Sequence, residues 1–200
     1  MVWYNFNMEQ NTRQKLIDAT YEEIYSHGYQ GSALADILAN AGVHKGSMYH
    51  FFPNKKEMAL CAINEKMGER FDNVYRGIAH QEAPYLPRLY ALIRDTSRRD
   101  FKRGCPIANL VQEMSNIDED FNRTMKEMYA QFRLSIKAIF DQAIESGELK
   151  ECDTAKLALF TTSALEGAIL AAKASGEPQD YIDAVECLIG YIESFRCMHP

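Results

Sequence analysis

Apolar residues along the chain recur every three or four positions, the spacing that places them on one face of an α-helix. The longest such run consists of Phe121, Met125, Met128, Phe132, Ile136 and Ile139. Alternation of β-branched and polar residues, which would indicate strands, forms no run along the sequence. The pattern therefore predicts an all-α protein.

Glycine and proline residues divide this pattern into about nine helices. Gly28, Gly42 and Gly147 follow periodic runs, at positions where helices commonly end. Ser32 is a favoured N-cap for a second helix, and Pro53-Asn54 breaks and recaps the chain. We expect seven helices over about residues 12–27, 32–41, 44–51, 106–115, 118–146, 153–175 and 179–197. Two further helices are expected to start near residue 55 and within residues 84–87. Residues 1–8 are expected to be a disordered arm outside the fold.

The composition, with 46% hydrophobic and 25% charged residues in a chain of 200, is typical of a soluble globular protein. No segment approaches the roughly 20 apolar residues of a membrane span, and the N-terminus lacks the pattern of a secretory signal. We therefore expect a cytoplasmic protein without a membrane partner. The five cysteines are scattered and form no CxxC pair, which argues against a disulfide framework and a metal site. A redox-sensing thiol stays open as an alternative to simple buried cysteines.

The net charge of −6 is unevenly distributed. Residues 1–56 carry five basic and five acidic side chains, so the whole excess of acidic residues lies in the rest of the chain. Three of the five cations, Lys45, Lys55 and Lys56, lie within residues 45–56. A small basic patch on an acidic protein is compatible with DNA binding and disfavours non-specific contacts elsewhere.

Residues 33–51 have the pattern of a helix-turn-helix, with Gly42 at the turn. The inward positions would be Ile37, Ala41, Val43, Met48 and Phe51. The outward positions of the second helix would be His44, Lys45, Ser47, Tyr49 and His50, which can donate to phosphates and base edges. An ordinary helical hairpin in a core is the alternative interpretation. The shortness of the second helix, and the donors on it, favour DNA binding.

The run AGVHKGSMYHFFPNKKE, residues 41–57, together with Gly28-Tyr29 and Asp36-Ile37, resembles the N-terminal domain of the TetR family of transcriptional regulators. The resemblance covers roughly residues 12–60. It departs from the family pattern at His44, where Ser or Thr is usual, and at Leu38, where Ala is usual. Residues 104–110, GCPIANL, resemble a motif of one subset of that family, which more often has Gly at the position of Ala108.

The resemblance implies a DNA-binding domain over residues 1–56 and an effector-binding and dimerisation domain over residues 57–200. In the family pattern, Lys45, Gly46 and Ser47 would enter the major groove beside His44, and Tyr49 and His50 would contact the backbone or flanking bases. Ser32 and Lys55 would hold phosphates at helix starts. For Tyr49 packing against the first helix, and for His50 a solvent-facing position without a contact, stay open as alternatives.

The resemblance further implies a homodimer formed by the last two helices, although an internal hairpin in a monomer is the alternative. The predicted interface consists of Ala164, Gly167, Ala168, Ala171, Val185, Leu188 and Ile192. A dimer would place two recognition helices about 34–36 Å apart, as a palindromic operator requires.

An effector site is implied among the C-terminal helices. Its candidate residues are Tyr90, Asn109, Met114, Met125, Tyr129, Phe132, Phe160 and Glu166, each of which could instead be simple core. Aromatic and Met side chains suit an apolar or amphipathic small molecule, and a buried Glu166 would select a cation or a hydrogen-bond donor.

The predicted function is therefore a repressor that its effector releases from operator DNA. No HExxH spacing, catalytic pair, phosphate loop or cofactor motif indicates an enzyme. A helical adaptor that binds protein but not DNA stays open as the alternative.

Overall fold

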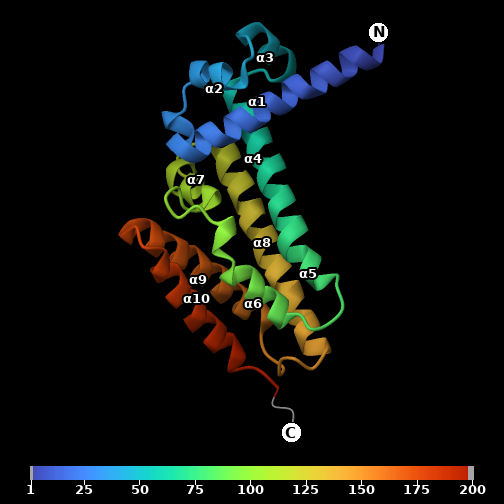
Figure 1. Cartoon of the computed structure of the whole chain (residues 1–200), viewed down its shortest axis with the longest axis vertical. Helices are drawn as coiled ribbons and strands as arrows, with labels where there is room; N and C mark the ends of the chain where they lie inside the picture. The colour runs from blue at the N-terminus through green and yellow to red at the C-terminus, as the bar shows by residue number, and fades with distance from the viewer. Residues whose placement is uncertain (1, 198–200) are drawn as a thin grey trace. The chain divides into compact units, whose positions relative to one another are not determined.

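The computed structural model describes the backbone of residues 2–197 and the side-chain environments of residues 11–68 and 74–197. Over residues 2–197 the chain forms ten α-helices and no β-strand, which confirms the all-α prediction (Figure 1). The helices are α1 (Val2–Gly31), α2 (Leu34–Ala41), α3 (Lys45–Phe51), α4 (Lys55–Phe71), α5 (Gly77–Ala79), α6 (Leu86–Arg94), α7 (Pro106–Met114), α8 (Glu119–Glu145), α9 (Thr154–Ser175) and α10 (Pro178–Glu193). The sequence pattern missed three short elements, namely a π-helix over Asp72–Arg76, α5, and a 3₁₀ turn over Thr96–Arg98.

Helix α1 begins at Val2, so the predicted disordered arm is wrong for residues 2–8; Met1 lies outside the described residues. The helix is interrupted at Gly28, whose φ of 75° and ψ of 169° are not helical. This confirms the predicted end of the first helix at Gly28, because a side chain at positive φ would be strained. A last helical turn then continues to Gly31.

The predicted helix ends at Gly42 and Gly147 are confirmed, since both glycines have positive φ, as has Gly176 at the end of α9. At the start of α4, Asn54 Oδ1 accepts a hydrogen bond from the Glu57 amide at 2.8 Å, as an N-cap does. The predicted N-cap of α2 is wrong. Ala33 occupies that position, and its methyl side chain cannot accept a capping bond; Ser32 Oγ donates instead to the Gly28 carbonyl at 2.6 Å.

The chain folds into two compact units. The first contains the residues up to Gly68 together with Asn109–Met125, and the second contains Glu69–Ala108 and the residues from Lys126 onward. None of the three points at which the chain passes from one unit to the other coincides with the predicted division at residue 56. In the first unit α1, α2, α3 and α4 enclose a core of Leu16, Ile17, Ile37, Leu38, Ala41, Met48, Phe52, Met58 and Ala62. This core fixes α3 through one buried side chain, Met48.

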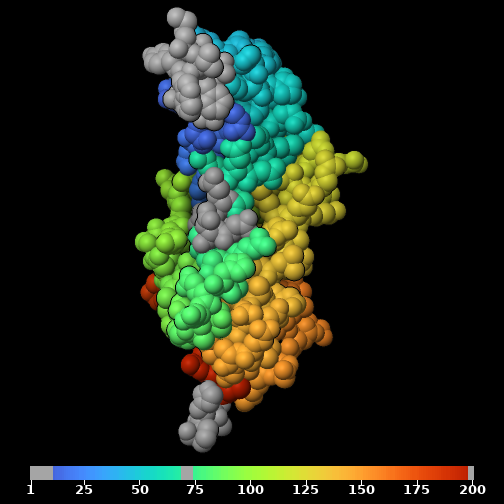
Figure 2. Space-filling view, turned by 90° about the vertical axis from the view of Figure 1, so that its right-hand side faces the viewer, coloured from blue at the N-terminus to red at the C-terminus, as the bar shows by residue number. Residues whose placement is uncertain are grey.

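In the second unit α9 and α10 form a helical hairpin (Figure 1). Tyr181 of α10 is buried and donates to the Ile93 carbonyl of α6 at 2.7 Å. Figure 2 shows the residues of α5 and α6, in green, adjoining the orange second half of α8. The rings of Tyr75 and Phe132 meet there at 5.0 Å between centroids.

Helix α9 is long and apolar enough to cross a membrane by length and composition, with a mean hydropathy of 1.3 over its best window. The expectation that no segment approaches a membrane span is therefore wrong. The helix packs against α10 as part of the second unit, and a single helix of this kind is also typical of a soluble core.

Candidate nucleic-acid interface and effector site

Helix α3 presents its polar face to solvent. His44, Lys45, Gly46, Ser47, Tyr49 and His50 are all exposed, whereas Met48 is fully buried. A Cβ added at Gly46 would meet nothing within 4 Å, so this position is open to close approach. His44 is the N-cap of α3 but makes no side-chain capping bond, unlike the Ser or Thr that its position usually carries. The structure thus gathers these six predicted DNA-binding residues on one accessible surface.

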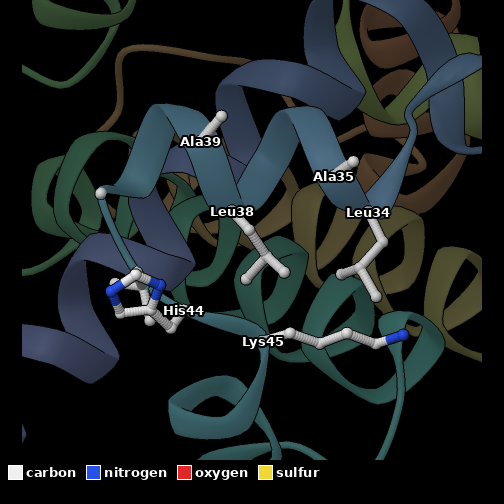
Figure 3. A pocket seen from close by; sticks show the side chains of 8 residues that line it. Leu34, Ala35, Leu38, Ala39, His44 and Lys45 are labelled. Carbon is white, nitrogen blue, oxygen red and sulfur yellow. The ribbon is translucent and has the colours of Figure 1, made fainter.

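A hollow of about 580 Å³ adjoins this face between α2 and the start of α3. It is lined by Leu34, Ala35, Leu38, Ala39, Gly42, Val43, His44 and Lys45. Figure 3 shows Leu34 and Leu38 pointing from α2 toward the side on which His44 and Lys45 lie. Apolar side chains beside polar donors can contact sugar edges and thymine methyl groups while the donors reach phosphates or bases.

Two of the three cations of the predicted basic patch are engaged inside the first unit. Lys55 Nζ donates to the carbonyls of Tyr29 and Ser32 and lies 4.3 Å from the centroid of the Tyr29 ring. Burial, opposed by the charge of Glu113, lowers the pKa of Lys55. Lys56 Nζ pairs with Asp118 and Asp120 at 2.7 and 2.5 Å, and these bonds raise its pKa. Of the three, Lys45 is the cation on the exposed face of α3.

Ser32 is 2% exposed, and its hydroxyl is bonded to Gly28. The predicted phosphate contacts of Ser32 and Lys55 would require these internal bonds to be exchanged, so both roles stay predictions.

The residues Gly28–Ser32, Lys55 and Glu113 form what we call the Gly28 junction. Glu113 of α7 accepts from the amides of Tyr29 and Gln30 at 3.0 and 2.8 Å. A Cβ at Gly28 would lie 2.6 Å from Glu113 Oε2, so only glycine leaves room for this carboxylate. This role of Glu113 could not be predicted from the sequence, because its partners are main-chain amides 83 and 84 positions away.

Most of the predicted dimer residues lie inside the protomer. Ala168, Val185, Leu188 and Ile192 are at most 3% exposed, because the apolar side of α10 packs within its own unit. Gly167 and Ala171 are exposed, and Ala164 is intermediate. The large apolar side chains exposed on α9 and α10 are Leu159 (48%), Phe160 (48%), Leu170 (55%), Ile182 (37%) and Tyr191 (46%). We call Phe160, Gly167, Leu170, Ala171 and Tyr191 the α9–α10 strip.

The predicted effector residues are divided between the two units. Phe160 lies at the surface, with its ring 4.8 Å from that of Tyr191. Tyr90 and Phe132 are buried in the second unit, whereas Asn109, Met114 and Met125 belong to the first. Tyr129 and Glu166 are close enough that the charge of Glu166 adds to burial in raising the pKa of the Tyr129 hydroxyl.

Two residues that the sequence did not assign to the effector site, Arg99 and Cys105, join Tyr129 and Glu166. Cys105 Sγ donates to Glu166 Oε1 at 3.3 Å. Burial, reinforced by the charge of Glu166, raises the pKa of the Cys105 thiol to about 12. Burial raises the pKa of Glu166 as well, opposed by the Cys105 hydrogen bond and the charge of Arg99. A protonated, buried thiol is a poor nucleophile, so Cys105 lacks the usual character of a redox sensor.

Among the residues whose side chains are described, no group of three His, Cys, Asp or Glu residues is placed to hold a metal ion.

Comparison with known proteins identifies two matched segments. Residues 16–61 match the model of bacterial regulatory proteins of the tetR family, and residues 86–188 match the tetracyclin repressor-like C-terminal domain. The chain is 33% identical to the transcriptional regulator AcuR of Cereibacter sphaeroides over 176 residues, 82% of this chain and 78% of that protein. It is 24% identical to the transcriptional repressor NemR of Escherichia coli over 154 residues, 75% of each protein. The crystal structure of a regulatory protein TetR from Rhodobacter sphaeroides superposes with a TM-score of 0.78 at 31% identity, covering 89% of this chain and 97% of that one.

Proposed function

Because this chain belongs to the TetR family, whose members are helix-turn-helix transcriptional regulators, we propose that it is a cytoplasmic repressor. It binds a palindromic operator as a homodimer, and a small apolar or amphipathic effector releases it. The observation that carries the proposal is the exposed polar face of α3, held outward by the buried side chain of Met48.

Lys45, Gly46 and Ser47 enter the major groove in this proposal, since they lie in the first turn of α3 and are exposed. Tyr49, half exposed, lies one turn further, and its ring centroid is 5.9 Å from Lys45 Nζ. The cation and the phenol can therefore contact neighbouring groups of one DNA strand. The residues of the hollow beside Lys45 extend this surface toward α2.

The α9–α10 strip forms the dimer interface in this proposal. Its exposed aromatic and aliphatic side chains are of the kind that interfaces bury, and a Cβ at Gly167 would meet nothing within 4 Å. Gly167 and Ala171 lie one turn apart on α9 and leave room for a partner helix to approach closely.

Helix α7 transmits the effector signal in this proposal. It begins at Pro106, directly after Cys105, and carries Glu113, which accepts two amide hydrogen bonds at the Gly28 junction. The junction connects α1 to α2, so a displaced Glu113 would change how the helix-turn-helix is held. A coupling of about 1–3 kcal/mol between effector and operator binding is typical of such linkage.

The test measures binding to a DNA fragment from upstream of the gene by fluorescence anisotropy over a range of salt concentrations. We expect Lys45→Ala and Tyr49→Ala each to weaken specific binding by at least about tenfold, and Lys45→Ala to lower the salt slope by about 1. Lys150 is an exposed lysine of the second unit, so Lys150→Ala is the charge-matched control and should change neither the affinity for the operator nor the salt slope. Unchanged binding by both α3 variants, with intact folding, contradicts the proposed interface.

The dimer is tested by light scattering after size-exclusion chromatography. Leu170→Arg, which places a charge in the α9–α10 strip, should give monomers that bind the full operator weakly. Ile117→Arg, an equally exposed apolar residue of the first unit, is the control and should leave the dimer intact.

A further inference from the structure

Inside the second unit, Cys105 is hydrogen-bonded to Glu166, and Arg99 and Tyr129 are close enough to interact with Glu166 electrostatically; we call these four side chains the Glu166 cluster. Arg99 follows the 3₁₀ turn, Cys105 precedes α7, Tyr129 lies on α8 and Glu166 on α9. Cys105 donates directly to Glu166, and the charge of Glu166 raises the pKa of the Tyr129 hydroxyl after burial. The positive charge of Arg99 lowers the pKa of Glu166, whereas burial raises it.

This cluster leaves hydrogen-bonding atoms unused. Glu166 Oε2 and Arg99 Nε are both buried, and neither has a hydrogen-bond partner among the described residues. A carboxylate offers about four acceptor sites, and here a single weak S–H donor occupies one of them. Buried polar atoms in folded proteins are nearly always paired, so two such atoms in one cluster indicate a missing partner.

Arg99 and Glu166 do not satisfy each other. Although the charge of Arg99 acts on Glu166, no hydrogen bond joins Arg99 Nε to Glu166 Oε2, since both of these atoms are without a partner among the described residues. Arg99 is held elsewhere, with its guanidinium carbon 4.7 Å from the ring centroid of Tyr181. The ring of Phe101 also packs against that of Tyr181, with 5.1 Å between the centroids. Aromatic surface therefore accompanies the guanidinium of Arg99.

The two unpaired atoms make opposite demands on a ligand. Glu166 Oε2 calls for a hydrogen-bond donor, and Arg99 Nε calls for an acceptor. A cation would be attracted by Glu166 but repelled by Arg99, and an anion would meet the reverse. We propose that the effector carries a neutral carboxamide-type group, whose N–H donates to Glu166 and whose carbonyl accepts from Arg99. This inference rests on the proposed effector-binding function and specifies the chemistry of its ligand.

The test uses three probes with one tail and different heads: octanamide, octanoate and octylamine. Binding to the full-length protein is measured by titration calorimetry. Octanamide should bind at least about tenfold more tightly than either charged probe, because only its head pairs both atoms. Glu166→Ala and Arg99→Met should each remove most of that preference. Glu127→Ala, an exposed residue of α8, is the control and should keep it.

Tighter binding of octylamine that is lost in Glu166→Ala would overturn the proposal in favour of a cation site. Tighter binding of octanoate that is lost in Arg99→Met would overturn it in favour of an anion site, and absence of binding by all three probes also overturns it. If one variant fails to fold by circular dichroism, the ranking of probes on the unaltered protein and the other variant still decide. Operator binding is measured in parallel. Protein that binds DNA but no probe refutes the head-group proposal alone, whereas protein that binds octanamide but no DNA supports it and contradicts the repressor.

Discussion

The Gly28 junction and the Glu166 cluster each bring a carboxylate and a cation together within one unit, but they use these groups differently. At the junction, both oxygens of Glu113 accept main-chain amides, and Lys55 donates to two main-chain carbonyls. In the Glu166 cluster, one carboxylate oxygen and one guanidinium nitrogen are left without partners. The junction is complete as a structural joint, whereas the cluster has capacity for a ligand.

The contrast predicts where substitutions should affect stability and where they should affect binding. Groups whose hydrogen bonds are all made within the chain stabilise the fold, and their removal leaves buried main-chain atoms unpaired. Groups that await a partner contribute little to the fold of the free protein and more to its complex.

Gly28→Ala should produce the largest effect. A side chain at φ 75° costs roughly 1–2 kcal/mol, and the new Cβ would displace Glu113 from two amides. We expect a loss of about 3 kcal/mol in the free energy of unfolding, measured by urea denaturation. Gly31→Ala is the control, because its Cβ would lie 3.5 Å from His27 Cβ, an ordinary contact. Equal effects of the two substitutions would contradict a special role for Gly28.

Lys55→Met should be the next largest, since the methionine keeps the length of the side chain but cannot donate to Tyr29 and Ser32. We expect the free energy of unfolding to fall by about 2 kcal/mol. This is less than two fully buried hydrogen bonds to a charged group would contribute, because Lys55 is partly solvated. Lys45→Met, on the exposed face of α3, should leave the unfolding free energy nearly unchanged while it weakens DNA binding. The opposite ranking in a denaturation series would show that Lys55 is not structural.

Glu166→Gln should have a smaller effect that depends on pH. Because burial raises the pKa of Glu166, its contribution to stability is fully present below the ordinary value of 4.5 and is lost as the pH rises through the folded value. The variant should therefore gain stability relative to the unaltered protein as the pH increases. Thermal denaturation from about pH 4 to about pH 8 measures this difference. A difference that stays constant across this pH range would argue against a perturbed carboxyl at Glu166.

Lys56→Gln should produce the smallest effect. Its partners Asp118 and Asp120 lie at the surface, where solvent and salt weaken an ion pair. We expect a slight fall in the melting temperature at low salt that disappears at high salt. If Lys56→Gln destabilised the protein as much as Lys55→Met, the buried contacts of Lys55 would not be what distinguishes the two lysines.

Local chemistry explains which features could be predicted from the sequence. The ends at Gly42 and Gly147 follow from the need for positive φ, and the outward face of α3 follows from helical spacing around Met48. Long-range contacts explain the misses. Nothing near Lys55 in the sequence distinguishes it from Lys56, yet the carbonyls of Tyr29 and Ser32 draw one lysine inward.

The same dependence on long-range contacts limits the prediction of the interface on the C-terminal helices. Val185 and Ile192 have the spacing of an interface stripe, but spacing alone cannot tell whether a protomer covers that stripe by itself. In the effector site, Arg99 became a candidate only once folding had brought it near Glu166.

The discontinuous composition of the first unit has a practical consequence for building hybrid regulators. Grafting residues 1–60 onto another sensor domain would leave behind Glu113, Asp118 and Phe121, although Phe121 packs 4.6 Å from the Tyr29 ring. A hybrid that takes residues 109–125 together with the N-terminal segment keeps the first unit intact. Such a hybrid needs three junctions in the chain.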